Sequence, residues 1–179
     1  MTPEERFIAI ATKKSTKAKQ SSLIHQWLGF PCSQSASIRL GNYIEEFINQ
    51  SVGDRNIKSA ILDDGETITA DGQVHQVDHL IQSENGDIYH LEAKCNLDLD
   101  RGKKRDVVTR DAIITKELTK VIGTDVKCAV FCPLMEESKT TTDLGYIMGM
   151  REFVSLFRPD FTLTEFNQLG KSPAIHSVL

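Results

Sequence analysis

The stretch that decides the fold is Val77-Asp78-His79-Leu80-Ile81, followed after a short polar turn by Ile88-Tyr89-His90-Leu91-Glu92-Ala93-Lys94. Both segments are mostly apolar, and the polar turn between them predicts a hairpin of two buried strands. Asp78 is nevertheless placed on the first strand, and Glu92 and Lys94 on the second. Ionisable groups are costly to bury unless they are paired, hydrogen-bonded or bound to a metal ion. The hairpin therefore predicts a divalent-metal site with a lysine beside it.

The length of the turn decides whether the two carboxylates meet. Alternate residues of a strand share a face, and directly paired residues of neighbouring strands also share one. A two-residue turn would point Asp78 away from Glu92. A three-residue loop at Glu84-Asn85-Gly86, with its glycine in the left-handed conformation, brings the two acids opposite each other. Because this loop prefers glycine at its third position, we predict the three-residue loop.

A Glu-x-Lys triplet is weak evidence by itself. One is expected by chance in roughly every second chain of this length, and this chain has another at Glu137-Ser138-Lys139. The second triplet lies in a polar stretch, residues 136–142, that predicts a loop. Glu92-Ala93-Lys94 differs because it ends an apolar strand that follows Asp78. The alternative is a surface hairpin whose charges face solvent, as most charged side chains do.

Apolar spacing predicts the other elements of the chain. Helices are expected from Pro3 with Thr2 as its cap, over about 15–28, from a cap at Ser35 or Ser37 to residue 53, over 106–122 and over 150–157. The apolar face of the 106–122 helix would consist of Val107, Ile114, Leu118 and Val121. Strands are expected over 57–62, 126–132 and 146–148. This order predicts an α/β domain with a central mixed β-sheet flanked by helices.

The size and composition of the chain are those of one globular domain of 179 residues. No apolar run approaches the ~20 residues that span a membrane, and the N-terminus has no signal pattern, so we expect a cytoplasmic protein. The net charge of −4 does not indicate a nucleic-acid partner, but the position of charge matters more than its sum. A basic cluster follows the hairpin and could contact backbone phosphates, although such runs are commonly solvated helix faces or loops. The cluster consists of Arg101, Lys103, Lys104, Arg105 and Arg110, and the last four are the residues that we expect to contact phosphates.

The hairpin resembles the PD-(D/E)xK nuclease superfamily. Asp78 corresponds to the first acid of that motif, and Glu92-Ala93-Lys94 to its second half; Val77 replaces the proline that often precedes the acid. A glutamate on the helix before the sheet often joins the metal site in this superfamily, and Glu45 matches it. The alternative for Glu45 is a solvated helix residue. The resemblance covers roughly residues 40 to 132.

This resemblance implies a Mg²⁺-dependent hydrolysis of phosphodiesters that leaves a 5′-phosphate and a 3′-hydroxyl. One or two Mg²⁺ ions would be held by Asp78, Glu92, the Ala93 carbonyl and Glu45. Lys94 would orient the attacking water and stabilise negative charge. Gln76 and His90 share the Asp78 face and could support the site, although both could equally be ordinary polar residues at a sheet edge.

A small single-domain enzyme of this kind looks most like a type II restriction endonuclease acting on double-stranded DNA as a homodimer. Within one domain, 1–179, we expect N-terminal helices over 1–53, a catalytic core over about 54–132, and a C-terminal segment over about 133–179 that reads DNA. A structure-specific or repair nuclease of the same fold is the nearest alternative. A non-catalytic DNA-binding protein with a degenerate site is an alternative from another class.

Overall fold

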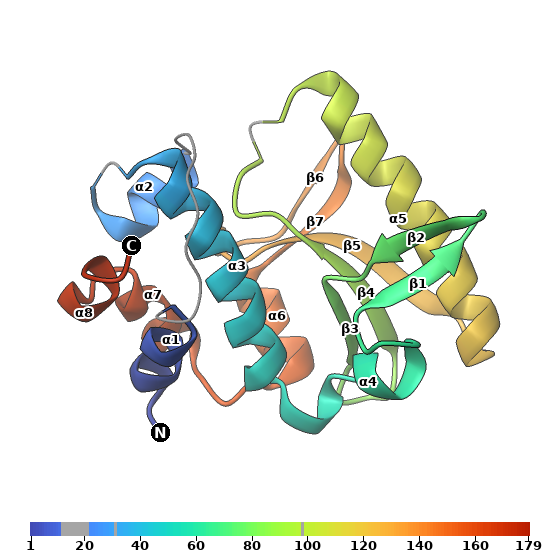
Figure 1. Cartoon of the computed structure of the whole chain (residues 1–179), viewed down its shortest axis with the longest axis horizontal. Coiled ribbons are helices and arrows are strands. Elements are labelled where there is room, and N and C mark those ends of the chain that lie inside the picture. Colours follow the sequence, from blue (N-terminus) through green and yellow to red (C-terminus); the bar gives the residue numbers. More distant parts are fainter. Residues whose placement is uncertain (12–21, 31, 98) are drawn as a thin grey trace.

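The computed structural model describes residues 1–11, 22–30, 32–97 and 99–179. As the sequence predicts, the chain is an α/β protein whose five-stranded mixed sheet is flanked by helices (Figure 1). The helices are α1 (Pro3–Ala11), α2 (Ser22–Leu28), α3 (Gln34–Ser51), α4 (Lys58–Ile61), α5 (Arg101–Ile122), α6 (Met150–Phe157), α7 (Leu163–Leu169) and α8 (Pro173–His176), with a 3₁₀ turn η1 (Gly53–Arg55). The strands are β1 (Thr67–Ala70), β2 (Gln73–Gln76), β3 (His79–Gln82), β4 (Ile88–Ala93), β5 (Val126–Cys132), β6 (Lys139–Thr141) and β7 (Gly145–Gly149). None of the helices in the described ranges is both long and apolar enough to cross a membrane.

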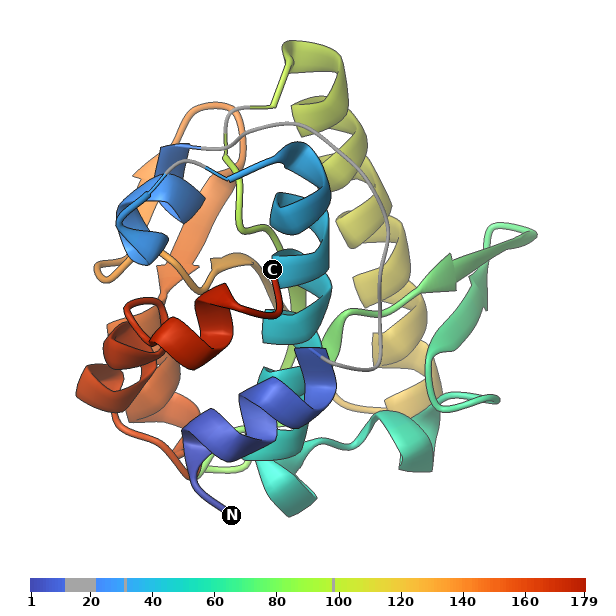
Figure 2. The same ribbon diagram turned by 60° about the vertical axis from the view of Figure 1, so that its left-hand side comes forward.

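The sheet has the strand order β3-β4-β5-β7-β6. Strands β4, β5 and β7 run parallel, whereas β3 and β6 are antiparallel to their neighbours at the two edges. Helix α5 makes the crossover that parallel β4 and β5 require. Strands β1 and β2 form a separate hairpin that projects from the domain beside α5 (Figure 2).

The two faces of the sheet have different partners. Helices α3 and α6 cover one face with an aromatic core, in which the rings of Phe131 and Phe153 stack with centroids 4.6 Å apart. Helices α1, α7 and α8 pack together on the outer side of α3 (Figure 2). Helix α5 covers the other face, where Ile114 and Leu118 pack against Leu80. The side chains of Glu92 and Lys94 belong to this second face.

The β3–β4 hairpin has the predicted register. Gln82 pairs with Ile88 and the Ser83 amide donates to the Asp87 carbonyl at 2.8 Å, which leaves Glu84-Asn85-Gly86 as a three-residue loop. Gly86 has a φ of +91°, a conformation that few residues other than glycine adopt. Leu80 pairs with His90, so the same register places Asp78 opposite Glu92.

Several predicted boundaries are confirmed. Thr2 and Glu5 form a reciprocal capping box at the start of α1. Strand β5 covers Val126–Cys132 as predicted, and α6 ends at Phe157 before Pro159. Of the helix predicted over about 15–28, the structure describes Ser22–Leu28 as α2, and the earlier part lies outside the described residues.

Other predicted elements are wrong, each for a local reason. Residues 57–62 are not a strand: the Asn56 side chain accepts a hydrogen bond from the Lys58 amide at 3.1 Å and starts the single turn of α4. The cap of α3 is Ser33, whose hydroxyl accepts from the Ala36 amide, rather than Ser35 or Ser37. The polar stretch 136–142 is not only a loop, because residues 139–141 pair with β7 as the exposed edge strand β6.

Helix α5 also differs from its prediction. It begins at Arg101 instead of Asp106, because the Asp100 side chain accepts from the Lys103 amide at 2.9 Å and caps it. Val121 is exposed rather than part of the apolar face. The buried face of this helix instead includes a carboxylate, Asp111. Helices α7 and α8 had no predicted counterpart.

Candidate active site

Asp78 and Glu92, two of the three acids predicted to bind metal, meet where β3 begins and β4 ends. Glu92 and Ala93 are the last residues of β4, and Lys94 follows directly. Asp78 lies in the short connection between β2 and β3 rather than inside a strand, which corrects the sequence prediction. Its Oδ2 accepts a hydrogen bond from the Ala93 amide at 2.9 Å, and this bond ties the start of β3 to the end of β4.

Lys94 lies between the two carboxylates. Its Nζ donates to Glu92 Oε1 and, at 2.9 Å, to the Ala93 carbonyl oxygen, and it is 3.9 Å from Asp78 Oδ2. The ammonium thus contacts or approaches three of the four oxygen groups that the sequence assigns to a metal ion, and Glu45 is the fourth. Two carboxylates and a carbonyl that converge on one positive charge are donors of the kind that Mg²⁺ prefers. The donor set therefore fits a hard divalent cation.

Burial makes the Asp78 carboxylate difficult to ionise. The pKa of Asp78 is raised above its ordinary value, first by burial and then by the negative charge of Glu92. The positive charge of Lys94, the Ala93 amide and the charge of Arg110 oppose this shift of the pKa. A bound cation would offset the same repulsion between the two acids.

Two residues that the sequence did not identify position Asp78. Asn49 on α3 and Lys58 on α4 both donate from their side chains to the Asp78 carbonyl oxygen, each at 3.2 Å. Asn49 Oδ1 also lies 2.8 Å from Nδ1 of His79, which is fully buried against Phe131. The available signals were the spacing of Asn49, one helical turn after Glu45, and a lone lysine in the apolar run 57–62.

Glu45 shares a cavity with Asp78. The cavity has a volume of about 810 Å³ and lies between α3, α4 and the β1–β2 hairpin. Glu46 lines it as well, and so does Gln76, which is exposed at the end of β2. The structure therefore brings Glu45 and Gln76 to the same space as the first acid of the motif.

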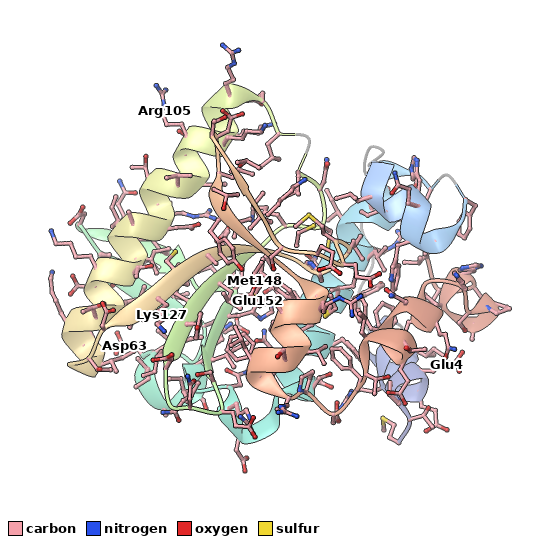
Figure 3. The ribbon with its side chains drawn as sticks, turned by 180° about the vertical axis from the view of Figure 1, so that it is seen from behind. Glu4, Asp63, Arg105, Lys127, Met148 and Glu152 are labelled. Carbon is pink, nitrogen blue, oxygen red and sulfur yellow. The ribbon has the colours of Figure 1, made fainter. Side chains whose placement is uncertain are left out.

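A basic groove of about 750 Å³ lies on the other side of the β1–β2 hairpin. Three of the four predicted phosphate-binding residues line it together with Lys94: Lys103, Arg105 and Arg110. The Arg110 guanidinium donates to Glu92 Oε1, and Arg105 projects from the first turns of α5 (Figure 3). Lys104 does not line this groove, because the helix turns it toward Asp143, with which it forms an ion pair at 3.2 Å.

His90 is fully buried under α5 instead of lying at a sheet edge. Its Nδ1 is 2.9 Å from the Thr115 hydroxyl, and one ligand atom each of His90, Glu92 and Asp111 lies within 4.8 Å of the others. Burial lowers the pKa of His90 to about 4 and, with the charge of Glu92, raises the pKa of Asp111 to about 7. The signal for Asp111 was its spacing, four residues after Val107 on the apolar face of the helix.

No model of a known protein family matches this chain, and no curated protein matches its sequence. The fold defines the class of the protein, an α/β protein built on a five-stranded mixed sheet. Its activity is therefore inferred from the chemistry of the residues gathered at the end of β4.

Proposed function

We propose that this protein is a Mg²⁺-dependent nuclease of the PD-(D/E)xK superfamily, and specifically a type II restriction endonuclease. It would cut double-stranded DNA and leave a 5′-phosphate and a 3′-hydroxyl. The observation that carries this proposal is the convergence of Asp78, Glu92 and the Ala93 carbonyl on the ammonium of Lys94. This corner adjoins both the cavity that Glu45 lines and the basic groove along α5.

The two carboxylates and the Ala93 carbonyl would hold Mg²⁺, and Glu45 would join them across the shared cavity. When bound, the ion would lower the pKa of a water and offset charge on the scissile phosphate. Lys94 would orient the attacking water and stabilise developing negative charge, because its amine already lies among the ligand atoms. Asn49 and Lys58 would keep Asp78 in place through its carbonyl oxygen.

The basic groove supports DNA as the substrate. Lys103, Arg105 and Arg110 would contact backbone phosphates, which gives affinity without sequence information. Lys104 would contribute on the neighbouring side of α5. A homodimer would place one active centre on each strand of a palindromic site. A cytoplasmic location is part of the same proposal.

We propose that only one part of the C-terminal segment contacts DNA bases. Helices α7 and α8 pack with α1, on the far side of the domain from α5 (Figure 1). Strands β6 and β7 lie nearer to the N-terminal end of α5, since Asp143 between them contacts Lys104. Within residues 133–179 we therefore assign base contacts to the β6–β7 region.

The test is digestion of phage DNA and of several unmethylated genomic DNAs by the purified full chain with Mg²⁺. A fixed pattern of fragments that disappears with EDTA is expected. Nicking of branched DNA without such a pattern would favour a repair or structure-specific nuclease of the same fold. DNA binding in a gel-shift assay without any cleavage would favour a non-catalytic DNA-binding protein and contradict the proposal.

A further inference from the structure

Three buried side chains between β4 and α5 each have a polar atom without a partner. No described residue forms a hydrogen bond with these atoms, which are Nε2 of His90, Oε2 of Glu92 and Oδ1 of Asp111. The exposed fractions of these residues are 0, 1 and 4%. One ligand atom of each lies within 4.8 Å of the others. A buried polar atom without a hydrogen bond destabilises the folded state, so three such atoms together point to a missing partner.

We propose that His90, Glu92 and Asp111 form a second cation site, which binds a divalent first-row transition-metal ion such as Mn²⁺ or Zn²⁺. This site is separate from the Mg²⁺ site proposed above and shares one carboxylate with it. It does not depend on nuclease activity, because it is inferred from the unpartnered atoms alone.

The partners of these residues fit a cluster of acceptors when His90 is in the tautomer that is protonated at Nδ1. The Nδ1 atom of His90 is 2.9 Å from the Thr115 hydroxyl, one helical turn after Asp111. With Nδ1–H donating to that hydroxyl, Nε2 presents a lone pair, as the imidazole of a metal ligand does. Glu92 offers Oε2, since its Oε1 accepts from Lys94 and Arg110. In that tautomer the cluster combines two carboxylates with an imidazole lone pair, and one ligand atom of each residue lies within 4.8 Å of the others, an arrangement that a cation or a proton would stabilise.

The ligand types favour a transition metal over Mg²⁺. Imidazole nitrogen suits Zn²⁺ and related ions, whereas Mg²⁺ prefers an all-oxygen shell. Ligand atoms about 2 Å from a tetrahedral Zn²⁺ ion lie about 3.3 Å apart, so a separation of 4.8 Å between two of the ligand atoms has to shorten by about 1.5 Å when the ion binds. Asp111 also lines a surface cavity of about 220 Å³ beside Cys128 and Tyr146. This cavity gives an ion and its water ligands a route to the cluster.

The test uses Mn²⁺ added below one equivalent to the full chain at pH 8, above the pKa of Asp111 of about 7. Electron spin-echo envelope modulation detects a ¹⁴N nucleus coordinated to Mn²⁺. All ligands of the proposed Mg²⁺ site are oxygens, so nitrogen modulation reports only an imidazole ligand. We expect modulation in the wild-type protein and in Asp78→Asn, and none in His90→Gln.

Matched substitutions identify the other members of the site. Asp111→Asn keeps the shape of the side chain and should abolish the nitrogen-coupled Mn²⁺ signal, whereas Asp125→Asn, at an exposed position, should leave it unchanged. Thr115→Val should weaken Mn²⁺ binding by about tenfold, as expected when the group that orients a ligating histidine is lost. Circular dichroism of each variant controls for folding.

Wild-type protein without nitrogen modulation, or modulation that persists in His90→Gln, would overturn the proposal and indicate that the cluster shares a proton. This outcome is distinguishable from failure of the nuclease proposal. Loss of the second site leaves Mg²⁺-dependent cleavage testable, and a protein that cuts no DNA can still show the nitrogen-coupled ion.

Discussion

The chain contains two Glu-x-Lys triplets, and their glutamates differ in burial, in position within the sheet and in the residues that they contact. The side chain of Glu92 is 1% exposed, whereas that of Glu137 is 70% exposed. Glu92 is the penultimate residue of β4, which lies between β3 and β5 under α5, and Glu137 precedes the edge strand β6. The same Glu-x-Lys pattern therefore gives a buried acid inside the sheet and a solvent-exposed acid at its edge.

The partners of the two glutamates differ as well. Glu92 lies opposite a second carboxylate, Asp78, and its own lysine lies between the two acids. Glu137 accepts a hydrogen bond from Nε of Arg151 at 2.6 Å. Surface ion pairs of this kind contribute little to the stability of the fold. A charge that is buried near a like charge needs a cation, and an exposed ion pair does not.

The largest difference is expected from neutralising each glutamate. Glu92→Gln should lower the rate of Mg²⁺-dependent DNA cleavage by about 100-fold or more, because one ligand charge and the electrostatic stabilisation it supports are lost. Glu137→Gln should cleave at the wild-type rate. Initial rates on the same DNA, with folding checked by circular dichroism, decide the comparison; equal rates for the two variants would contradict it.

Replacing the lysines should separate catalysis from DNA binding. Lys94→Met keeps most of the side-chain volume but removes the ammonium from the ligand corner, so we expect a loss of about 100-fold in kcat. The dissociation constant for DNA should change less than kcat does. Lys127→Met, on the sheet beyond the site and paired with Asp87, is the matched control and should change neither (Figure 3). A normal kcat for Lys94→Met would show that the Lys94 ammonium does not contribute to catalysis.

Asp78→Asn should stabilise the fold while it abolishes cleavage. Burial and Glu92 raise the pKa of Asp78, so the ionised form opposes folding at pH values above that raised pKa. The amide oxygen can still accept from the Ala93 amide. We expect a higher Tm than wild type at pH 7, with the gain disappearing as the pH falls toward the ordinary value of 3.8. Glu137→Gln should show no such gain, and a lower Tm for Asp78→Asn at pH 7 would count against this account of the site.

The smallest effect is expected at the glycines that precede or follow each triplet. Gly86 and Gly145 have φ angles of +91° and +68°, and an added Cβ would meet no atom within 4 Å at either. Alanine should therefore cost about 1 kcal/mol of unfolding free energy at both positions, through backbone strain alone. Only Gly86→Ala should also slow cleavage, since Gly86 shapes the loop that aligns Asp78 with Glu92. Urea unfolding and initial rates measure the two effects, and slower cleavage by Gly145→Ala would break the distinction.

Local rules predicted several elements of the fold. The cap at Thr2, the apolar run of β5 and the Gly86 loop each depend on neighbouring residues, and each is confirmed. The strand predicted over 57–62 is wrong, because a short apolar segment fits either a strand or a helix. The hydrogen bond from the Lys58 amide to the Asn56 side chain favours the helical turn. The predicted start of helix α5 at Asp106 is too late, because apolar spacing does not detect the polar first turn that Asp100 caps.

The sequence by itself determined that Asp78 and Glu92 face each other, because strand alternation and the three-residue loop are both local. Only the tertiary structure decided that His90 and Asp111 join Glu92, and that Asn49 and Lys58 hold the Asp78 backbone. These residues come from β4, α5, α3 and α4, and spacing along the chain does not specify how separate elements pack. The packing of α5 on the sheet buries His90 and Asp111, and this burial lowers the pKa of His90 to about 4 and raises the pKa of Asp111 to about 7.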